Sequence, residues 1–187
     1  TCALPICIDL TPHYIDVEDA RFFHQQLKDV CDKHHADYYP EFKTWADDYF
    51  YIRHRKETRG VGGIFFDRLS GDEGFTRAQR FAYVRDVGNA FCPIYLHLLA
   101  KSKDKPFSER EKNWQMLRRG RYVEFNLVWD AGTKFGLHTD GRTESILMSL
   151  PPVAHWAYNH QPEADSPEAR TLALLRKEVD WLTHTAP

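Results

Sequence analysis

Apolar residues in the first half of the chain recur at the three- and four-residue spacing of amphipathic helices. Residues 17–35 carry one apolar face behind Asp16, an N-cap residue followed by acidic side chains, and this pattern predicts a helix. Residues 40–55 and residues 75–101 show the same spacing and predict two more helices. Within the last of these, Pro93 predicts a kink or a junction.

Shorter apolar runs predict strands. Residues 64–69 follow a glycine-rich turn and are rich in strand-forming side chains, so we expect a buried strand there, closed by a turn-rich stretch at 70–74. Residues 121–129 alternate in character and are β-branched or aromatic, and two further apolar runs lie at 145–152 and 155–162. We expect strands in these three runs. The glycine-bearing stretch between the first two, 130–144, is expected to be a functional loop.

Two local signals complete the predicted elements. Ser108 and Glu111 form a capping-box pattern for a shorter helix, and Ser166 with Pro167 starts an amphipathic helix near the C-terminus. Helices first and strands later indicate an α+β fold, a mostly antiparallel β-sheet flanked by layers of α-helices. The length of 187 residues is that of one domain, so we expect residues 1–187 to form a single core.

Charge and cysteine usage exclude several classes of protein. The 25 Lys and Arg against 27 Asp and Glu leave a formal charge of −2, which favours neither nucleic acid nor an anionic membrane as partner. The cysteines have no CxxC pair, so we expect reduced thiols and an intracellular protein; they are Cys2, Cys7, Cys31 and Cys92. No apolar run approaches the roughly 20 residues needed to cross a bilayer, so membrane insertion is not expected.

A cluster of basic residues surrounds the glycine-bearing stretch. The planar fork of arginine binds carboxylates through two hydrogen bonds, so the cluster could hold a polyanion. The alternative is a solvated basic face, and nucleic acid is a weaker option because the net charge is acidic. The residues concerned are Arg118, Arg119, Arg121, Lys134 and Arg142.

Single residues elsewhere suggest further chemistry. Asp9 ends an apolar run and could serve as a base or a hydrogen-bond acceptor, although a turn-capping aspartate is the simpler interpretation. His24 and His54 lie on predicted neighbouring helices and could meet at a metal; alternatively, each is a surface or hydrogen-bonded core histidine. The glycines at 60–63 match no phosphate-loop pattern.

Several long runs resemble the oxygen-dependent coproporphyrinogen oxidase family, in the family's order. They are DLTPHY at 9–14, YYPEFKTWADDYFYIRHRKETRGVGGIFFD at 38–67, RRGRYVEFNLVWD at 118–130, GTKFGL at 132–137 and GRTESILMSLPP at 141–152. The resemblance extends from about Asp9 to Trp181, nearly the whole chain, but covers only the later part of a family member.

The resemblance implies a flat antiparallel sheet between layers of helices, lacking here the family's N-terminal strands. It also implies a homodimer formed through about Tyr122 to Ala157. The reaction implied is the conversion of two propionates of coproporphyrinogen III to vinyl groups, yielding protoporphyrinogen IX. O2 is the co-substrate, CO2 and peroxide are released, and no organic cofactor is required. Relatives work in the cytoplasm or in mitochondria.

Site residues are carried over from the same resemblance. Asp9 matches a catalytic carboxylate that hydrogen-bonds the pyrrole NH groups. Asp140, Gly141 and Arg142 match a substrate-binding loop. His24 and His54 match histidines assigned to a divalent metal.

Three departures from the family pattern bear on activity. A tract like WFGGG is replaced by residues 3–7, the usual arginine of the DRGT turn is Ala131, and an upstream segment with a catalytic histidine and an arginine is absent. The chain begins with Thr1, which suggests a processed chain or a fragment. The alternatives are therefore a non-catalytic tetrapyrrole-binding or dimerisation module, or an altered gene product that folds poorly.

Overall fold

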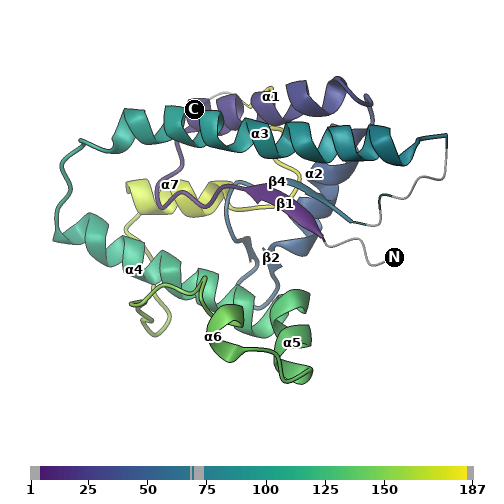
Figure 1. Ribbon diagram of the computed structural model, residues 1–187. Coiled ribbons are helices and arrows are strands. Elements are labelled where there is room, and N and C mark those ends of the chain that lie inside the picture. Colours follow the sequence, from purple (N-terminus) through teal and green to yellow (C-terminus); the bar gives the residue numbers. More distant parts are fainter. Residues whose placement is uncertain (1–4, 68, 70–73, 185–187) are drawn as a thin grey trace.

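The computed structural model describes residues 5–67, 69 and 74–184, and within these ranges it has an α+β fold (Figure 1). The helices are α1 (Val17–Asp32), α2 (Tyr38–Tyr49), α3 (Arg77–Ser102), α4 (Glu109–Glu124), the π-helix η1 (Phe125–Trp129), α5 (Ala131–His138), α6 (Thr143–Ile146) and α7 (Pro167–Leu174). The strands are β1 (Ile6–Asp9), β2 (Tyr51–Ile52), β3 (Glu57–Thr58) and β4 (Gly63–Phe66). Thr1, Cys2, Ala3, Leu4 and most of the stretch 70–74 lie outside the described residues.

Side-chain caps begin several helices where the sequence places them. The Asp16 carboxylate accepts hydrogen bonds from the backbone N–H groups of Glu18 and Asp19 at 2.9 and 3.0 Å, which confirms the start of α1. Ser108 and Glu111 form the expected capping box of α4. Each cap satisfies N–H groups that the first turn of a helix leaves without partners.

The expected strand at 121–129 is wrong. Residues 121–124 continue α4, and 125–129 form η1. Tyr122, Phe125 and Trp129 are three and four residues apart, so their apolar pattern also fits a helix face. Burial of Phe125, which is 0% exposed and packs on Phe50 with ring centroids 5.5 Å apart, decides between the two.

The later runs also differ from expectation. The stretch 130–144 contains helix α5 rather than only a loop, and the run 145–152 contains the end of α6 followed by turns. The run 155–162 has no regular structure. The sheets in the described residues are accordingly two antiparallel pairs, β1–β4 and β2–β3, smaller than the expected sheet.

Two helix boundaries need correction as well. The helix expected over 40–55 ends at Tyr49, because Phe50 is buried and its carbonyl accepts the N–H of Arg59 at 3.0 Å instead of continuing the helix. By contrast, α3 continues through Pro93 without interruption.

The β1–β4 pair lies at the centre of the molecule. Asp9 is opposite Gly63, and all four residues of β4 are buried. In Figure 1, α1 and α3 run above this pair, whereas α4, α5 and α6 lie below it. The main core combines side chains of α1, α2 and β4 with the C-terminal segment, from which Val179 and Trp181 are buried. Asp9 is therefore held at the end of β1, opposite the buried strand β4.

Glycines allow residues 60–63 to lie directly against β1. A Cβ at Gly60 would stand 2.2 Å from the carbonyl oxygen of Leu10, and a Cβ at Gly63 would stand 1.9 Å from that of Ile8. At this close approach Leu10 donates to Gly62 O at 3.1 Å and accepts from Val61 N at 3.0 Å. The glycine run thus serves backbone packing, which agrees with the absence of a phosphate-loop pattern.

The substitution Gly60→Ala should destabilise the protein by about 3 kcal/mol, because its Cβ meets backbone atoms that cannot rotate away. Gly88→Ala in α3 is the control: apart from the adjacent backbone of α3, no atom of the described residues lies within 4 Å of its Cβ position, and alanine should stabilise the helix by about 0.5–1 kcal/mol. Urea unfolding of the two variants measures both effects. Equal stability of Gly60→Ala and the parent chain would contradict the close approach.

Candidate functional site

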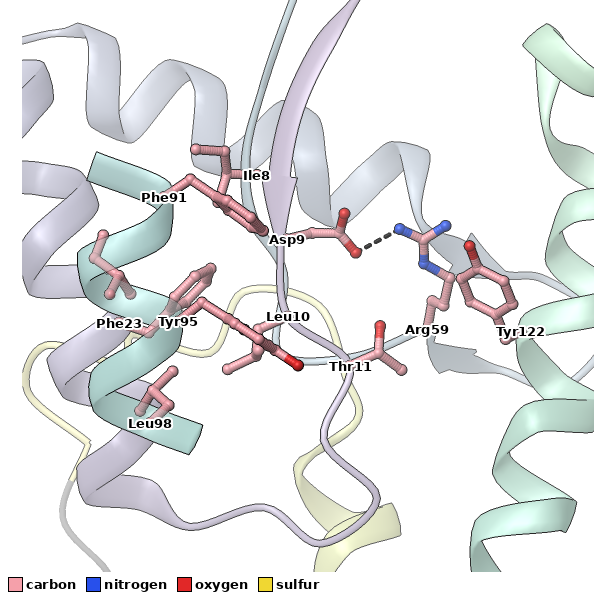
Figure 2. A pocket seen from close by; sticks show the side chains of 11 residues that line it. Ile8, Asp9, Leu10, Thr11, Phe23, Arg59, Phe91, Tyr95, Leu98 and Tyr122 are labelled. Carbon is pink, nitrogen blue, oxygen red and sulfur yellow. Dashed lines mark hydrogen bonds and ion pairs between the residues drawn. The ribbon is translucent and has the colours of Figure 1, made fainter. Parts of the chain in front are cut away.

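A cavity of about 530 Å³ opens where β1 ends, between α3 and α4 (Figure 2). Its volume is within the range of small-molecule sites. Apolar and aromatic side chains of α1, α3 and β1 form most of the wall, and one acidic and one basic side chain supply the charge. The residues that define it are Ile8, Asp9, Phe23, Arg59, Tyr95 and Tyr122.

An ion pair between Asp9 and Arg59 lies in this cavity. Nη2 of Arg59 donates to Oδ2 of Asp9. The Arg59 side chain is only 8% exposed and that of Asp9 17% exposed, so water screens their attraction weakly. Charge-assisted hydrogen bonds of this kind are about twice as strong as neutral ones. The ion pair therefore fixes the Asp9 carboxylate at the end of β1, where it lines the cavity.

Aromatic rings surround the guanidinium of Arg59. Its central carbon lies 4.0 Å from the ring centroid of Phe50, 4.9 Å from that of Phe125 and 5.2 Å from that of Tyr122. A cation over aromatic faces is attracted by their negative π clouds. Nε of Arg59 is buried and, among the described residues, has no hydrogen-bond partner. The site thus retains one buried donor beside the cavity.

The second carboxylate oxygen of Asp9 is lightly engaged. Oδ1 is contacted by Sγ of Cys7 at 3.8 Å, and a thiol is a weak donor. In Figure 2 the Asp9 side chain points across the cavity toward Arg59, with Tyr122 beyond it. Asp9 can therefore accept a further hydrogen bond from a ligand N–H while Arg59 compensates its charge.

His24 is a core residue. It is 0% exposed, and burial lowers its pKa to about 4. Nε2 is 2.9 Å from the carbonyl oxygen of Val61, which can only accept, so Nε2 carries the proton. Nδ1 then accepts from the Tyr39 hydroxyl at 3.0 Å. Both ring nitrogens of the neutral imidazole are engaged.

His54 lies in the turn after β2 and not on a helix, contrary to expectation. Its Nδ1 accepts from the indole N–H of Trp129 at 3.0 Å, and its Nε2 donates to Glu124 at 2.8 Å. His24 and His54 thus have separate partners, which does not fit a metal shared between them. No group of three or more His, Cys, Asp or Glu side chains in the described ranges is arranged to hold a metal.

Asp140, Gly141 and Arg142 form a turn between α5 and α6. Asp140 has a positive φ of 52°, and the N–H of Gly141 donates to Gly136 O at 2.9 Å. All three residues are exposed, and none of them is among the residues that line the Asp9 cavity. Within the single chain this turn does not line the cavity beside Asp9, and its substrate-binding role stays a prediction.

Arg59 is the site residue that sequence reasoning missed. It lies 50 positions from Asp9, and in the sequence it is one of several basic residues near 53–59. The glycines that follow Arg59 are a signal in the sequence. They allow residues 60–63 to lie directly against β1, and this places the preceding residue, Arg59, at the end of that strand. Pairing with Asp9 required the fold.

The described residues thus form an α+β fold whose cavity has the size of small-molecule sites, mostly apolar walls and one largely buried ion pair. The sequence model of the family described as Coproporphyrinogen III oxidase matches residues 7–181, most of the chain. The chain belongs to this family, whose members are oxidoreductases of porphyrin biosynthesis. The match includes Asp9 and Arg59. Within the described ranges, none of the helices combines the length and apolar character that crossing a bilayer requires.

His24 should make the protein less stable in acid. Its pKa is about 4 in the folded chain and 6.5 in the reference state, so the unfolded chain binds more protons between these values and stability falls as pH drops from 6.5 toward 4. Between pH 7 and pH 5 this single group should remove about 2 kcal/mol. In His24→Gln, whose amide can replace both hydrogen bonds, that part of the loss should disappear.

Urea unfolding of both proteins at pH 7 and pH 5 measures the difference. Burial also lowers the pKa of His13 to about 4, but His13 is present in both proteins and its contribution cancels. The same acid loss in the parent chain and in His24→Gln would show that His24 is not the group responsible.

Proposed function

We propose that the Asp9 cavity binds coproporphyrinogen III and that the protein catalyses its oxygen-dependent oxidative decarboxylation to protoporphyrinogen IX. The observation that carries the proposal is the buried Asp9–Arg59 pair at the edge of an apolar cavity. A tetrapyrrole presents apolar ring edges, N–H donors and carboxylates. The apolar walls of the cavity can contact the ring edges, the Asp9 carboxylate can accept hydrogen bonds from the N–H groups, and the Arg59 guanidinium can donate to a carboxylate.

Each decarboxylation balances without an organic cofactor. One propionic acid side chain and one O2 give a vinyl group, CO2 and H2O2. The pyrrole ring passes two electrons to O2 and regains them when the side chain loses CO2 and a proton. Positive charge develops on the ring nitrogen as electrons leave. A carboxylate already positioned beside that nitrogen stabilises the charge most strongly where water is scarce, and Asp9 meets this condition at 17% exposure.

Arg59 has two roles in this proposal. It holds Asp9 in place, and its remaining donors can bind a propionate. Arg142 is proposed as a second propionate contact, on the family resemblance alone. A divalent metal at His24 and His54 forms no part of the proposed reaction, because the ring nitrogens of both residues are engaged elsewhere.

A non-catalytic tetrapyrrole-binding module is the second candidate function. Ala131, where the family usually has arginine, is exposed at the start of α5 and supplies no cation there. Pro5 and Cys7 belong to the tract that replaces the family's glycines, and Pro5 cannot donate a backbone hydrogen bond. Binding of a tetrapyrrole without turnover would follow if these changes remove the reaction but leave the cavity.

We also propose a homodimer formed through residues 122–157. Large apolar side chains are exposed along this segment, and exposed apolar surface is a common sign of protein association. The residues are Leu127, Val128, Phe135, Leu137, Met148, Val153 and Trp156.

An intracellular, most simply cytoplasmic, location is proposed because Cys7, Cys31 and Cys92 are free thiols.

Asp9→Asn should lower kcat for protoporphyrinogen formation by about a hundredfold, because the neutral amide cannot stabilise the developing positive charge. Coproporphyrin affinity should change little, since the amide oxygen still accepts a hydrogen bond.

Arg59→Gln should weaken coproporphyrin binding by about 2–3 kcal/mol. Anaerobically prepared coproporphyrinogen III is mixed with O2 to follow turnover, and coproporphyrin titration measures binding.

Lys33→Gln is the control, because Lys33 is an exposed cation at the end of α1. Arg142→Ala is measured in the same titration, and unchanged affinity would remove Arg142 from the site. Coproporphyrin binding by the folded chain without turnover would favour the non-catalytic module. Parent-like turnover in Asp9→Asn would overturn the role of Asp9.

Phe135→Glu should raise the dimer dissociation constant by about tenfold or more, because it places a charge among the exposed apolar side chains of 122–157. Phe107→Glu is the matched control: Phe107 is 75% exposed, close to the 70% of Phe135, but lies outside the segment. Sedimentation velocity over a concentration series measures the equilibrium. A parent chain that stays monomeric, or equal effects of the two substitutions, would contradict the interface.

A further inference from the structure

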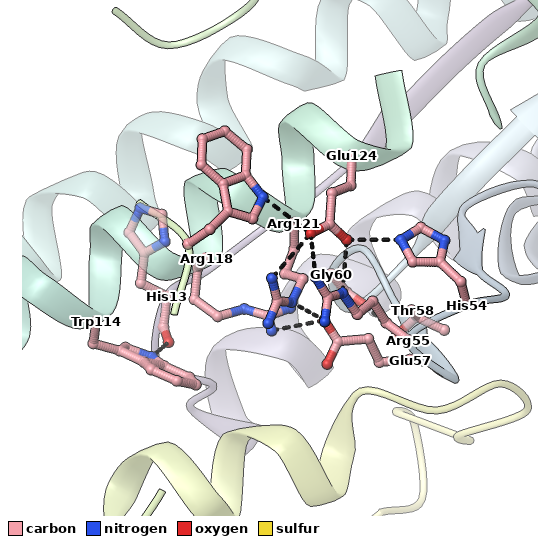
Figure 3. Close-up of polar contacts among 11 residues, drawn as sticks. His13, His54, Arg55, Glu57, Thr58, Gly60, Trp114, Arg118, Arg121 and Glu124 are labelled. Carbon is pink, nitrogen blue, oxygen red and sulfur yellow. Dashed lines mark hydrogen bonds and ion pairs between the residues drawn. The ribbon is translucent and has the colours of Figure 1, made fainter. Parts of the chain in front are cut away.

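A second cavity, of about 370 Å³, lies between α4, the turn that joins β2 to β3, and residues 159–161. It shares no lining residue with the Asp9 cavity. Figure 3 shows part of this wall, with the guanidinium groups of Arg118 and Arg121 turned toward Glu57. Its polar wall includes Lys56, Glu57, Arg118, Arg121, Asn159 and Gln161. The proposed reaction uses none of these residues.

Positive charge exceeds negative charge in this wall. Arg118 and Arg121 approach the same oxygen of Glu57, at 2.8 and 3.6 Å. Glu57 is the only carboxylate among the described residues that line the cavity. Lys56 adds a further exposed cation. Arg121 also donates to Glu124 at 3.1 Å, so with Arg55 and Glu124 counted as well, four cations face two carboxylates.

Arg55 does not change this balance, because it is committed to Glu124. Its Nε and Nη2 donate to the two oxygens of Glu124 at 2.8 and 2.6 Å. Burial alone would raise the pKa of Glu124, but hydrogen bonds from Arg55 and His54 and the charge of Arg121 lower it to about 2. Glu124 stays ionised and holds the turn against α4, outside the cavity wall.

Arg118 carries a buried donor without a partner. Its side chain is 4% exposed; Nη1 donates to Glu57 at 2.8 Å, whereas Nη2 has no hydrogen-bond partner within the described ranges. The guanidinium lies over the Trp114 ring, 5.6 Å from its centroid. Leaving a charged donor buried and unsatisfied is unfavourable, because its desolvation is not compensated. Arg118 also lines the second cavity, so an anion bound there would lie close to this guanidinium.

We infer that this second cavity binds a phosphate group, either as free phosphate or as a small phosphomonoester. Its donors come from three parts of the chain: the guanidiniums from α4, the ammonium of Lys56 from the turn, and the amides of Asn159 and Gln161 from a separate segment. Donors arriving from several directions suit a tetrahedral oxyanion better than a planar carboxylate. Arginine and lysine are the usual side-chain donors to phosphate.

Isothermal titration of the full chain with inorganic phosphate, and separately with glycerol phosphate, tests this site. The parent chain should bind one equivalent of at least one probe. Arg118→Gln should raise the dissociation constant by about tenfold or more, since it removes charge-assisted bonds. Lys56→Gln should raise it by a few-fold. Lys33→Gln, which removes a cation that does not line the cavity, should leave it unchanged.

Circular dichroism establishes that each variant is folded. Lys56 is exposed, so its substitution tests the site even if Arg118→Gln fails to fold. Tighter binding of glycerol phosphate would identify a phosphomonoester, and equal or weaker binding would identify free phosphate. The inference is overturned by the absence of saturable binding at millimolar phosphate, by equal dissociation constants in Lys56→Gln and the parent chain, or by succinate binding as tightly as phosphate.

Discussion

The buried guanidinium of Arg59 joins parts of the chain that are far apart in sequence. It pairs with Asp9 at the end of β1 and lies against Phe50, Tyr122 and Phe125. A charge buried this deeply is tolerated only where a counter-charge and polarisable surfaces surround it. One side chain, that of Arg59, therefore contacts the end of α2, the C-terminal part of α4 and the Asp9 carboxylate in the cavity.

Neighbouring residues of the same two segments serve the two cavities. Arg59 lines the Asp9 cavity, whereas Glu57 lines the second one; on α4, Tyr122 and Arg121 are divided in the same way. The turn before β3 is held to α4 by Glu124, which accepts hydrogen bonds from both sides. The turn and the helix that Glu124 links thus belong to segments that line both the Asp9 cavity, with one acid and one base, and the more cationic second cavity.

The candidate site could be predicted only in part. Asp9 was identifiable because an acid ends an apolar run inside a family motif, and the structure places it at the end of β1. Arg59 was not, because its partner is 50 residues away. For His24 and His54 the sequence leaves a metal site and hydrogen-bonded histidines open as alternatives, and in the fold each ring has its own hydrogen-bond partners.

By itself, the sequence determined the family, the α+β class and the helix starts at Asp16, Ser108 and Ser166, because caps and family motifs are local features. Only the tertiary structure decided that residues 121–129 are helical, since their apolar spacing fits a strand and a helix equally and the burial of Phe125 is a long-range effect. The same holds for both cavities. Their charges meet through contacts between distant segments, which no local pattern encodes.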